Sequence, residues 1–507
     1  MIPLTNETTA ARTAQHWWAA QSVRQRLGLI RQLRRHLLEQ RQALWEAVQA
    51  DTGRSPVEVL ASELLPIASA LRFLERRAAK LLSPRRVAWR DRPLWLWGCH
   101  DIVYRRPWGI VGIIGTWNYP LFLNIVPIAQ ALTAGNAILW KPSEQTPCCA
   151  DAIARLLAAA GCPAHLFQVL PVTREAGPLL AEADVDLVLF TGSEGVGRQL
   201  ARRLGERLIP SVLELSGCDP MWVFPDANVH LAARAAWFGT TFNRGQTCIA
   251  VRRIFVHRAV AEAFRVALHE VLEAAAATGT GQSCTLQTPA QVAQFHRLVR
   301  DALARGALLL TPYGQSSARG IDRESPSAES AASTAEPSTC QPTWLWNVPP
   351  DAAVLQESCF APLAAVVIVD SLEQALTLTR QCRFGLAASL FSGDVRQAQQ
   401  WAAHLPAGQV CVNDVLVPTA HPATPFGGRG ASGWGVTQGA EGLLTLTVPQ
   451  VVTVRRGRWR PHYDEAIKSH PAASQEMLEG LLLMSHAPTW RGRWQGVLRL
   501  LRGLRHR

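Results

Sequence analysis

The stretch GIVGIIGTWNYP at residues 109–120 decides the fold class, because an apolar run there ends in a glycine-containing turn and a helical pattern follows at 121–133. Three further apolar runs repeat this arrangement: NAILWKPS at 136–143, FQVLPV at 167–172 and VDLVLFTG at 185–192. Strands that alternate with helices are typical of a parallel sheet with crossover helices. The sequence therefore predicts an α/β fold.

The flanking segments extend this pattern. Residues 14–86 carry apolar positions at helical spacing and predict amphipathic helices. A second α/β unit begins near residue 213, with helical stretches at 231–242 and 259–276 and the apolar strands RRIFVH and AAVVIVD. Residues 316–343 are instead rich in Ser, Ala, Pro and Glu, so we expect a flexible surface insertion there.

Two segments alternate in the manner of extended strands. Residues 87–108 are also rich in aromatic side chains, and residues 441–454 return to alternation after the second α/β unit. The sequence predicts an extended arm here, of a kind suited to packing on another subunit.

Composition excludes several classes of protein. The chain has 507 residues, 48% of them hydrophobic and 18% charged, and no apolar run approaches the roughly 18 residues of a membrane-spanning helix. Its N-terminus has no secretion signal, so we expect a cytoplasmic protein. The 11 cysteines are odd in number and form no CxxC pair, which favours buried thiols over a disulfide framework or a structural metal site.

The net charge of +12 is concentrated near the C-terminus. Residues 453–507 hold 11 Lys or Arg against 4 Asp or Glu, a balance of +7. The basic character therefore describes one segment, and we expect no nucleic-acid partner for the chain as a whole.

Three residues could carry chemistry. Cys248 lies in a glycine-containing turn, FNRGQTCIA, where an exposed thiol of lowered pKa could act as a nucleophile, although most of the 11 cysteines must simply be buried. Glu214 follows an apolar strand and is either a structural partner or a general base. Asn118 ends another strand and is either a turn residue or a donor to a developing oxyanion.

Together these segments resemble the aldehyde dehydrogenase superfamily from about residue 20 to residue 454. The motifs WNYP, LWKPSEQTP, FTGSEGVG, LELSG, FNRGQTC and PFGGRGASGWG follow the family's order, and the branch most similar is the short-N-terminus group of fatty-aldehyde and coniferyl-aldehyde enzymes. The resemblance implies a Rossmann-type NAD(P)-binding domain at 1–87 and 107–214 and a catalytic domain at 215–427. It also implies an oligomerisation arm at 88–106 and 441–454, followed by a basic tail at 455–507.

The resemblance also implies catalytic roles. Cys248 would attack the aldehyde carbon, and the Asn118 amide would hold the resulting oxyanion. After hydride transfer to the nicotinamide, Glu214 would activate the water that cleaves the thioester and releases a carboxylic acid.

The implied cofactor is NAD, with NADP possible. Lys141 and Glu144 match positions that bind the adenosine ribose, where a carboxylate disfavours the 2′-phosphate of NADP. Gly192, Ser193 and Gly197 open a helix after a strand and would face the pyrophosphate. The remaining cofactor positions implied by the family are Trp117, Ser143, Leu215 and Phe360.

Two departures from the family pattern lie in this region. Ser216 stands where the family has a glycine, and Ser358 stands where a glutamate normally holds the nicotinamide ribose. Replacing a charged acceptor by a hydroxyl predicts weak positioning of the cofactor.

The expected substrate is a bulky apolar aldehyde: long-chain, aromatic or terpenoid. The tryptophans near the family's aldehyde tunnel favour it, and so does an amphipathic cationic stretch at 481–507 that could contact a membrane surface. Because of its glycines, we expect that stretch to be weakly helical in water and to order only on an interface. We expect a homodimer, and the alternative function is a catalytically weakened, membrane-associated binding or scaffold protein.

Overall fold

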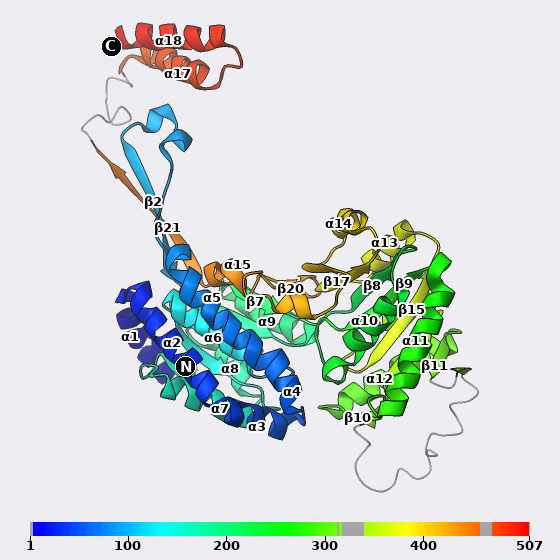
Figure 1. The fold of residues 1–507 in the computed structure, drawn as a ribbon. Helices are drawn as coiled ribbons and strands as arrows, with labels where there is room; N and C mark the ends of the chain where they lie inside the picture. The colour runs from blue at the N-terminus through cyan, green and yellow to red at the C-terminus, as the bar shows by residue number, and fades with distance from the viewer. Residues whose placement is uncertain (1–3, 312–313, 317–338, 457–468, 506–507) are drawn as a thin grey trace. The chain divides into compact units, whose positions relative to one another are not determined.

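The computed structural model describes residues 4–311, 314–316, 339–456 and 469–505 (Figure 1). The chain divides into two compact units. The body comprises Met1–Leu81 and Pro107–Thr447, and the arm unit comprises Leu82–Arg106 and Val448–Arg507. The two units are described separately below.

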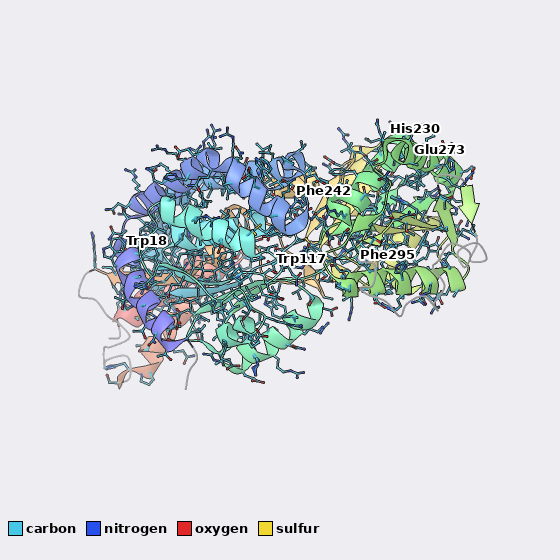
Figure 2. The ribbon with its side chains drawn as sticks, turned by 90° about the horizontal axis from the view of Figure 1, so that it is seen from below. Trp18, Trp117, His230, Phe242, Glu273 and Phe295 are labelled. Atoms are coloured by element: carbon cyan, nitrogen blue, oxygen red, sulfur yellow. The ribbon has the colours of Figure 1, made fainter. Side chains whose placement is uncertain are left out.

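The body begins with helices, as predicted from residue 14 onward, although the first helix already starts at Thr5. The helices are α1 (Thr5–Ala20), α2 (Val23–Glu39), α3 (Arg41–Thr52), α4 (Pro56–Val59) and α5 (Leu65–Leu81), with a π-helical turn η1 (Leu60–Leu64) before α5. Trp18 fixes α1 to the rest of the body, because its indole N–H donates to the carbonyl of Leu132 at 2.8 Å (Figure 2).

The first sheet of the body has six strands in the order β20-β7-β6-β3-β4-β5. The strands are β3 (Ile110–Ile114), β4 (Ala137–Lys141), β5 (Phe167–Val169), β6 (Leu187–Thr191), β7 (Ser211–Glu214) and the antiparallel β20 (Gly433–Trp434). Strands β3 to β7 are parallel, and α6 (Phe122–Ala134), α7 (Pro147–Ala159), α8 (Ala176–Glu182) and α9 (Glu194–Glu206) connect them. This confirms the predicted parallel α/β sheet.

The second sheet has eight strands in the order β12-β11-β14-β15-β9-β8-β17-β18. They are β8 (Asp219–Val223), β9 (Val251–His257), β11 (Leu308–Thr311), β12 (Gly314–Ser316), β14 (Thr343–Trp346), β15 (Leu363–Val369), β17 (Ala387–Phe391) and β18 (Gln409–Val412). Its helices are α10 (Val229–Thr241), α11 (Arg258–Thr278), α12 (Pro289–Ala304), α13 (Leu372–Gln381) and α14 (Val395–Ala402), and Figure 1 shows α10, α11 and α12 around the sheet. A second α/β unit is therefore confirmed.

Short elements complete the body. Strands β10 (Cys284–Thr285) and β13 (Thr339–Cys340) pair with each other, as do β16 (Phe384–Gly385) and β19 (Arg429–Gly430). Most of the expected insertion at 316–343 lies outside the described residues, but its last residues form β13 and the start of β14. All 11 cysteines are free thiols and seven are buried, as expected.

The arm unit is extended where the sequence alternates. Strands β1 (Arg85–Arg86), β2 (Cys99–Pro107) and β21 (Thr447–Arg455) form one sheet, and two 3₁₀ turns, η2 (Trp89–Asp91) and η3 (Leu94–Leu96), precede β2. The predicted strand at 441–454 begins too early, however. Residues up to Thr445 form α15 (Gly439–Thr445), which buries Leu443 in the body.

The C-terminal residues form two helices, α17 (Pro471–His486) and α18 (Trp490–Arg505), which pack against each other. The structure shows two full helices where a weakly helical tail was expected. Gly480, Gly496 and Gly503 lie at the contact between the helices, where a Cβ would collide with the facing backbone. None of the described helices is long and apolar enough to cross a membrane.

Candidate active site

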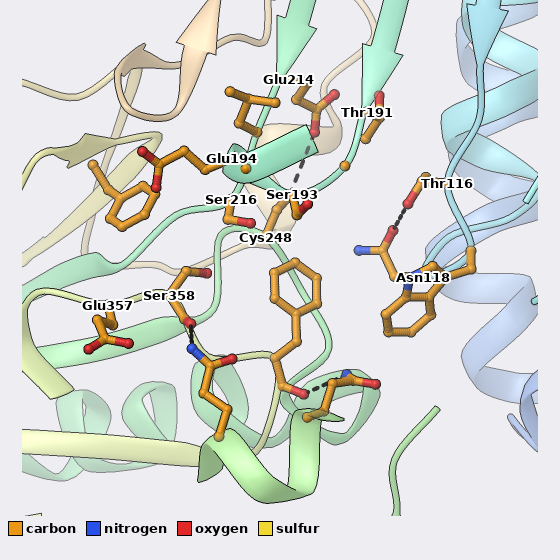
Figure 3. Close-up of a pocket in the computed structure, with 18 of the residues that line it drawn as sticks. Thr116, Asn118, Thr191, Ser193, Glu194, Glu214, Ser216, Cys248, Glu357 and Ser358 are labelled. Carbon is orange, nitrogen blue, oxygen red and sulfur yellow. Dashed lines mark hydrogen bonds between the residues drawn. The ribbon is translucent and has the colours of Figure 1, made fainter. Parts of the chain in front are cut away.

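A left-handed turn places Cys248. After α10, the residues Asn243, Arg244 and Gly245 have φ values of 51°, 58° and 70°. A Cβ at Gly245 would collide with the backbone of Ala361, so the turn needs glycine at this position. The chain then turns inward and brings the thiol of Cys248 to the wall of a cavity (Figure 3).

Hydrogen bonds join the Cys248 turn to the WNYP turn after β3. The side-chain amide of Asn243 donates to the carbonyl of Asn118 at 2.9 Å, and the side-chain amide of Asn118 donates to the carbonyl of Gln246 at 3.1 Å. The oxygen of the Asn118 side chain accepts from Thr116 at 2.9 Å, which fixes the amide with its nitrogen on the Cys248 side (Figure 3). One amide hydrogen of Asn118 thus remains to donate to an oxyanion.

Glu214 faces Cys248 from the end of β7. Its Oε1 lies 3.7 Å from Cys248 Sγ, and its residue is only 4% exposed. Gly217 permits this approach, because a Cβ there would lie 2.5 Å from the carbonyl oxygen of Cys248. The motifs LELSG and FNRGQTC are therefore far apart in the sequence but place their Glu214 and Cys248 side chains next to each other.

The surroundings raise the pKa of both groups. Burial raises the pKa of Glu214 to about 7, although the hydrogen bond with the Cys248 thiol lowers it. Burial and the Glu214 carboxylate raise the pKa of Cys248 well above its usual value. The expectation of a lowered thiol pKa was wrong for this structure. The geometry instead offers an adjacent carboxylate that can accept the thiol proton.

Two cavities meet at this pair. The larger, about 560 Å³, is lined by residues that follow strands of the first sheet and by residues of the second α/β unit, and the smaller is about 290 Å³. Leu123, Glu214 and Cys248 line both of them. A nucleophile and a base at the junction of two cavities can act on a substrate held in one with a cofactor held in the other.

The larger cavity has the features of a dinucleotide site. Of the implied cofactor residues it is lined by Trp117, Gly192, Ser193, Leu215 and Phe360, together with the departures Ser216 and Ser358. The N-terminus of α9 opens toward it, where backbone N–H groups suit a pyrophosphate, and the rings of Trp117 and Phe360 lie 6.1 Å apart. These residues fit NAD or NADP.

The other implied cofactor residues lie outside this lining. Gly197 is inside α9, where it lets Leu215 approach the helix. Lys141 ends β4, and its ammonium lies 2.6 Å from the carboxylate of Glu144, while the hydroxyl of Ser143 accepts the N–H of Gln145. The carboxyl end of β4, the strand next to β3, thus carries Lys141, Ser143 and Glu144.

The smaller cavity is walled by aromatic and aliphatic side chains. Its rings are Tyr119, Phe122, Phe238, Phe242 and Phe426. None of the six tryptophans expected there lines this cavity. Trp344 and Trp346 are buried in the core, Trp237 stacks on Trp344, and Trp108 donates to the carbonyl of Thr445. Trp434 is half exposed, and Trp117 lines the larger cavity. Trp117 and Phe242 are labelled in Figure 2 near the place where the two sheets of the body meet.

A buried ion pair beneath the WNYP turn was not foreseen. Glu63, in the π-helical turn, accepts from Arg54 at 2.6 Å and from the backbone N–H groups of Leu121 and Phe122, each at 2.8 Å. Its carboxylate therefore caps the N-terminus of α6 and holds the turn that carries Asn118. No motif marks this pair, because Arg54 and Glu63 touch the turn only in the folded chain.

A second unforeseen ion pair lies in the wall of the larger cavity. Arg383 Nη2 lies 2.7 Å from Glu194 Oε2, in the first turn of α9, and both side chains line the cavity. The amides of Gln291 and Gln294 hold the opposite wall by donating to the carbonyls of Phe360 and Ser358 at 2.9 and 2.8 Å.

The sequence profile of the aldehyde dehydrogenase family matches residues 5–452. The chain belongs to the aldehyde dehydrogenase family. It is an NAD(P)-dependent oxidoreductase of the EC 1.2.1 type, acting on small-molecule aldehydes, and the predicted fold and family are both confirmed.

Relatives of this aldehyde dehydrogenase cover most of its length. A 4,4′-diapolycopene aldehyde oxidase of Methylomonas sp is 31% identical, over 89% of this chain and 82% of the relative. A putative NADP⁺ succinate-semialdehyde dehydrogenase of Mycolicibacterium smegmatis is 34% identical, over 88% and 83%. The crystal structure of a Mycobacterium tuberculosis aldehyde dehydrogenase complexed with NAD⁺ is 27% identical, with a TM-score of 0.77 and 89% of each chain covered.

The aldehyde dehydrogenase has no group of three or more His, Cys, Asp or Glu side chains arranged to hold a metal ion within the part of the chain that the structure describes. Where its two cavities meet, the nucleophilic and acid–base groups are Cys248 and Glu214, with Asn118 nearby as the neutral donor.

Proposed function

We propose that this aldehyde dehydrogenase oxidises a hydrophobic aldehyde, long-chain, aromatic or terpenoid, to its carboxylic acid. The observation that carries the proposal is the smaller cavity. Among the residues that the structure describes, its lining contains one ionisable carboxylate, Glu214, and no Lys, Arg or His. An apolar tail gains about 25 cal/mol for each Å² that it buries against such a wall. The cavity ends at Cys248, where the aldehyde group would lie.

The reaction proceeds through the residues at the junction. Glu214 accepts the proton of Cys248, and the sulfur adds to the aldehyde carbon to form a thiohemiacetal. The Asn118 amide and the backbone N–H of Cys248 donate to its oxyanion. NAD(P), held by the residues that line the larger cavity, would supply the hydride acceptor. Glu214 first releases the thiol proton to solvent and then draws a proton from the water that hydrolyses the thioester. The acid leaves, and the Cys248 sulfur leaves the acyl carbon as a thiolate that takes up a proton again.

The lining of the smaller cavity supports one of the substrates named for relatives over the other. A succinate semialdehyde carries a second carboxylate, which would be buried without a cationic partner in this wall. The aldehyde named for the Methylomonas relative is a long apolar chain, which the lining suits better. We therefore assign the present enzyme to apolar substrates.

Glu144 favours NAD over NADP. Its carboxylate is over a third exposed and is held by Lys141 at the strand end that the family uses for the adenosine ribose. A 2′-phosphate would meet this carboxylate, whereas a 2′-hydroxyl could donate to it.

The experiment is NADH formation with a matched aldehyde series. We expect kcat/KM to rise from propanal to decanal by about threefold or more for each CH₂ that enters the cavity, and to be lowest for succinate semialdehyde. Cys248→Ala is the control and should give no turnover. A preference for succinate semialdehyde over decanal would contradict the proposal.

A second function is favoured by Ser216 and Ser358, which line the cofactor cavity and depart from the family. It is a catalytically weakened protein that binds aldehydes or serves as a scaffold at a membrane. We place either protein in the cytoplasm, as a homodimer joined through the arm and in contact with a membrane surface through residues 481–507. Turnover lost on Cys248→Ala supports the enzyme, and turnover absent in the unmodified chain supports the second function.

A further inference from the structure

The positive charge of the chain belongs to the arm unit. Residues 82–106 and 448–507 contain 17 Lys or Arg and 6 Asp or Glu, which gives +11 of the total +12. The rest of the chain is nearly neutral, with 34 basic and 33 acidic residues. A charge so confined marks one part of the molecule for contact with an anionic partner.

Within this unit, glycines join α17 and α18. A Cβ at Gly480 would lie 2.5 Å from the nitrogen of Leu500, and one at Gly503 would lie 2.7 Å from the carbonyl oxygen of Ala473. A Cβ at Gly496 would collide with the nitrogen of Met484. The two helices therefore touch backbone to backbone, and the large apolar side chains of α18 are not needed to hold them together.

Those large side chains lie on the opposite side of α18. At 100° per residue, the glycines at 492, 496 and 503 fall within 40° of one another, and the apolar face is centred about 160° or more away. This face consists of Trp490, Trp494, Leu498, Leu501 and Leu504, each between 48% and 70% exposed. A helix that packs by its glycines thus presents its tryptophans and leucines to the outside.

Arginines border this face. Arg491 and Arg502 lie along one edge, Arg493 lies along the other, and Arg505 borders the face at the C-terminal end of the helix. The fifth arginine of α18, Arg499, pairs with Glu479 of α17. Residues 490–505 contain no acid, and no ion pair is found for the four bordering arginines among the described residues.

We propose that α18 lies flat on an anionic lipid bilayer, with its tryptophan and leucine face inserted and the bordering arginines at the lipid phosphates. Tryptophan suits the boundary between headgroups and acyl chains, and long arginine side chains reach back to the headgroups. A second copy of the chain is the less suitable occupant, because two such faces would bring arginine against arginine. The proposal deepens the proposed function, since a hydrophobic aldehyde dissolves in the same bilayer.

The test measures binding without catalysis. The full-length Cys248→Ala protein is sedimented with vesicles of phosphatidylcholine containing 30% phosphatidylglycerol, and with vesicles of phosphatidylcholine alone. We expect binding to the anionic vesicles only, weakened by salt, and at least tenfold weaker after joint Trp490→Ala and Trp494→Ala substitution. Trp17→Ala, at a tryptophan 54% exposed on α1, is the matched control and should bind as the parent does.

Charge is tested separately. Each arginine near an anionic surface contributes about fivefold in affinity, so joint Arg491→Gln, Arg502→Gln and Arg505→Gln substitution should weaken binding about hundredfold. The same three changes at the exposed Arg31, Arg202 and Arg300 of the body give a control of equal net charge and should have little effect.

Several outcomes would overturn the proposal. If the two triple arginine variants lose vesicle affinity equally, binding depends on the net charge of the protein and not on α18. If the protein binds equally to vesicles with and without phosphatidylglycerol, anionic lipid has no role. No binding, together with a larger oligomer in light scattering that Trp490→Ala and Trp494→Ala dissolve, would make the face an interface between copies. The enzymatic activity is measured separately, as turnover of a water-soluble aldehyde by the protein with intact Cys248. This measurement does not depend on membrane binding.

Discussion

Cys248 Sγ lies 3.7 Å from Glu214 Oε1, and the environment raises the pKa of both groups. The thiol cannot be a free thiolate at neutral pH in this arrangement, and its proton can pass to the carboxylate beside it. One carboxylate would then serve both halves of the reaction, first for the thiol and later for water. This relationship determines the pH dependence of the enzyme.

Activity should rise with pH. Glu214 must be ionised to accept a proton, and its pKa is about 7, so kcat limited by thioester hydrolysis should increase through that value and level off above it. The raised pKa of Cys248 should make kcat/KM for the free enzyme keep rising at higher pH. Steady-state rates with one aldehyde from pH 5.5 to 9 measure both. A profile that is flat between pH 6 and 8 would contradict this assignment.

The same carboxylate should destabilise the folded protein above neutrality. The pKa of Glu214 is higher in the folded chain than its ordinary value of 4.5, so the folded state binds more protons between pH 4.5 and 7, and its stability falls as pH rises through that window. Glu214→Gln mimics the protonated form. We expect it to raise the Tm at pH 8 by a few degrees, to raise it less at pH 5.5, and to abolish turnover. An equal gain at both pH values would count against the burial of this charge.

Strand patterns were predictable because the central strands of the first sheet are buried on both faces. The runs around Ile110, Ala137 and Leu187 match β3, β4 and β6 closely, and the motifs also located Cys248, Glu214 and Asn118 around one cavity. Features set by packing at a distance were not predictable. The pKa of Cys248 depends on burial beside Glu214, which lies 34 residues away in sequence. Gly496 disfavours a helix when it is judged from the sequence alone, and its role appears only once its contact with α17 is known.

The oxyanion donor should affect kcat more than substrate binding. Asn118→Ala removes the amide, and the loss of one such donor lowers kcat by about 10²–10³. Thr116→Val removes only the hydroxyl that orients the Asn118 amide, so we expect a loss of about tenfold with little change in KM. Steady-state kinetics on both variants measures whether Asn118→Ala lowers kcat more than Thr116→Val does. If Thr116→Val lowers kcat as much as Asn118→Ala does, the Thr116 hydroxyl acts directly on the oxyanion.

The buried ion pair should be essential for stability. Glu63→Ala leaves the Arg54 guanidinium without its carboxylate and two N–H groups of α6 without an acceptor, which should cost about 3–5 kcal/mol. Urea denaturation followed by fluorescence measures this cost. Glu46→Ala, at an exposed glutamate on α3, is the control and should stay within about 0.5 kcal/mol of the parent. Similar midpoints for the two variants would remove the proposed role of Glu63.

Ser358 should limit the rate of hydride transfer. Its hydroxyl is buried at the edge of the cofactor cavity and has no hydrogen-bond partner within the described residues, where the family has a carboxylate for the nicotinamide ribose. Ser358→Glu would restore a charge-assisted hydrogen bond of about 1.5–3 kcal/mol. Because Gln294 already holds the backbone carbonyl of residue 358, the new side chain would act from a fixed position. We expect the single-turnover rate of NADH formation to rise tenfold or more, while Ser358→Ala, which adds no acceptor, should give no increase. If both variants match the parent, the cofactor is positioned by other groups and the serine does not weaken the enzyme.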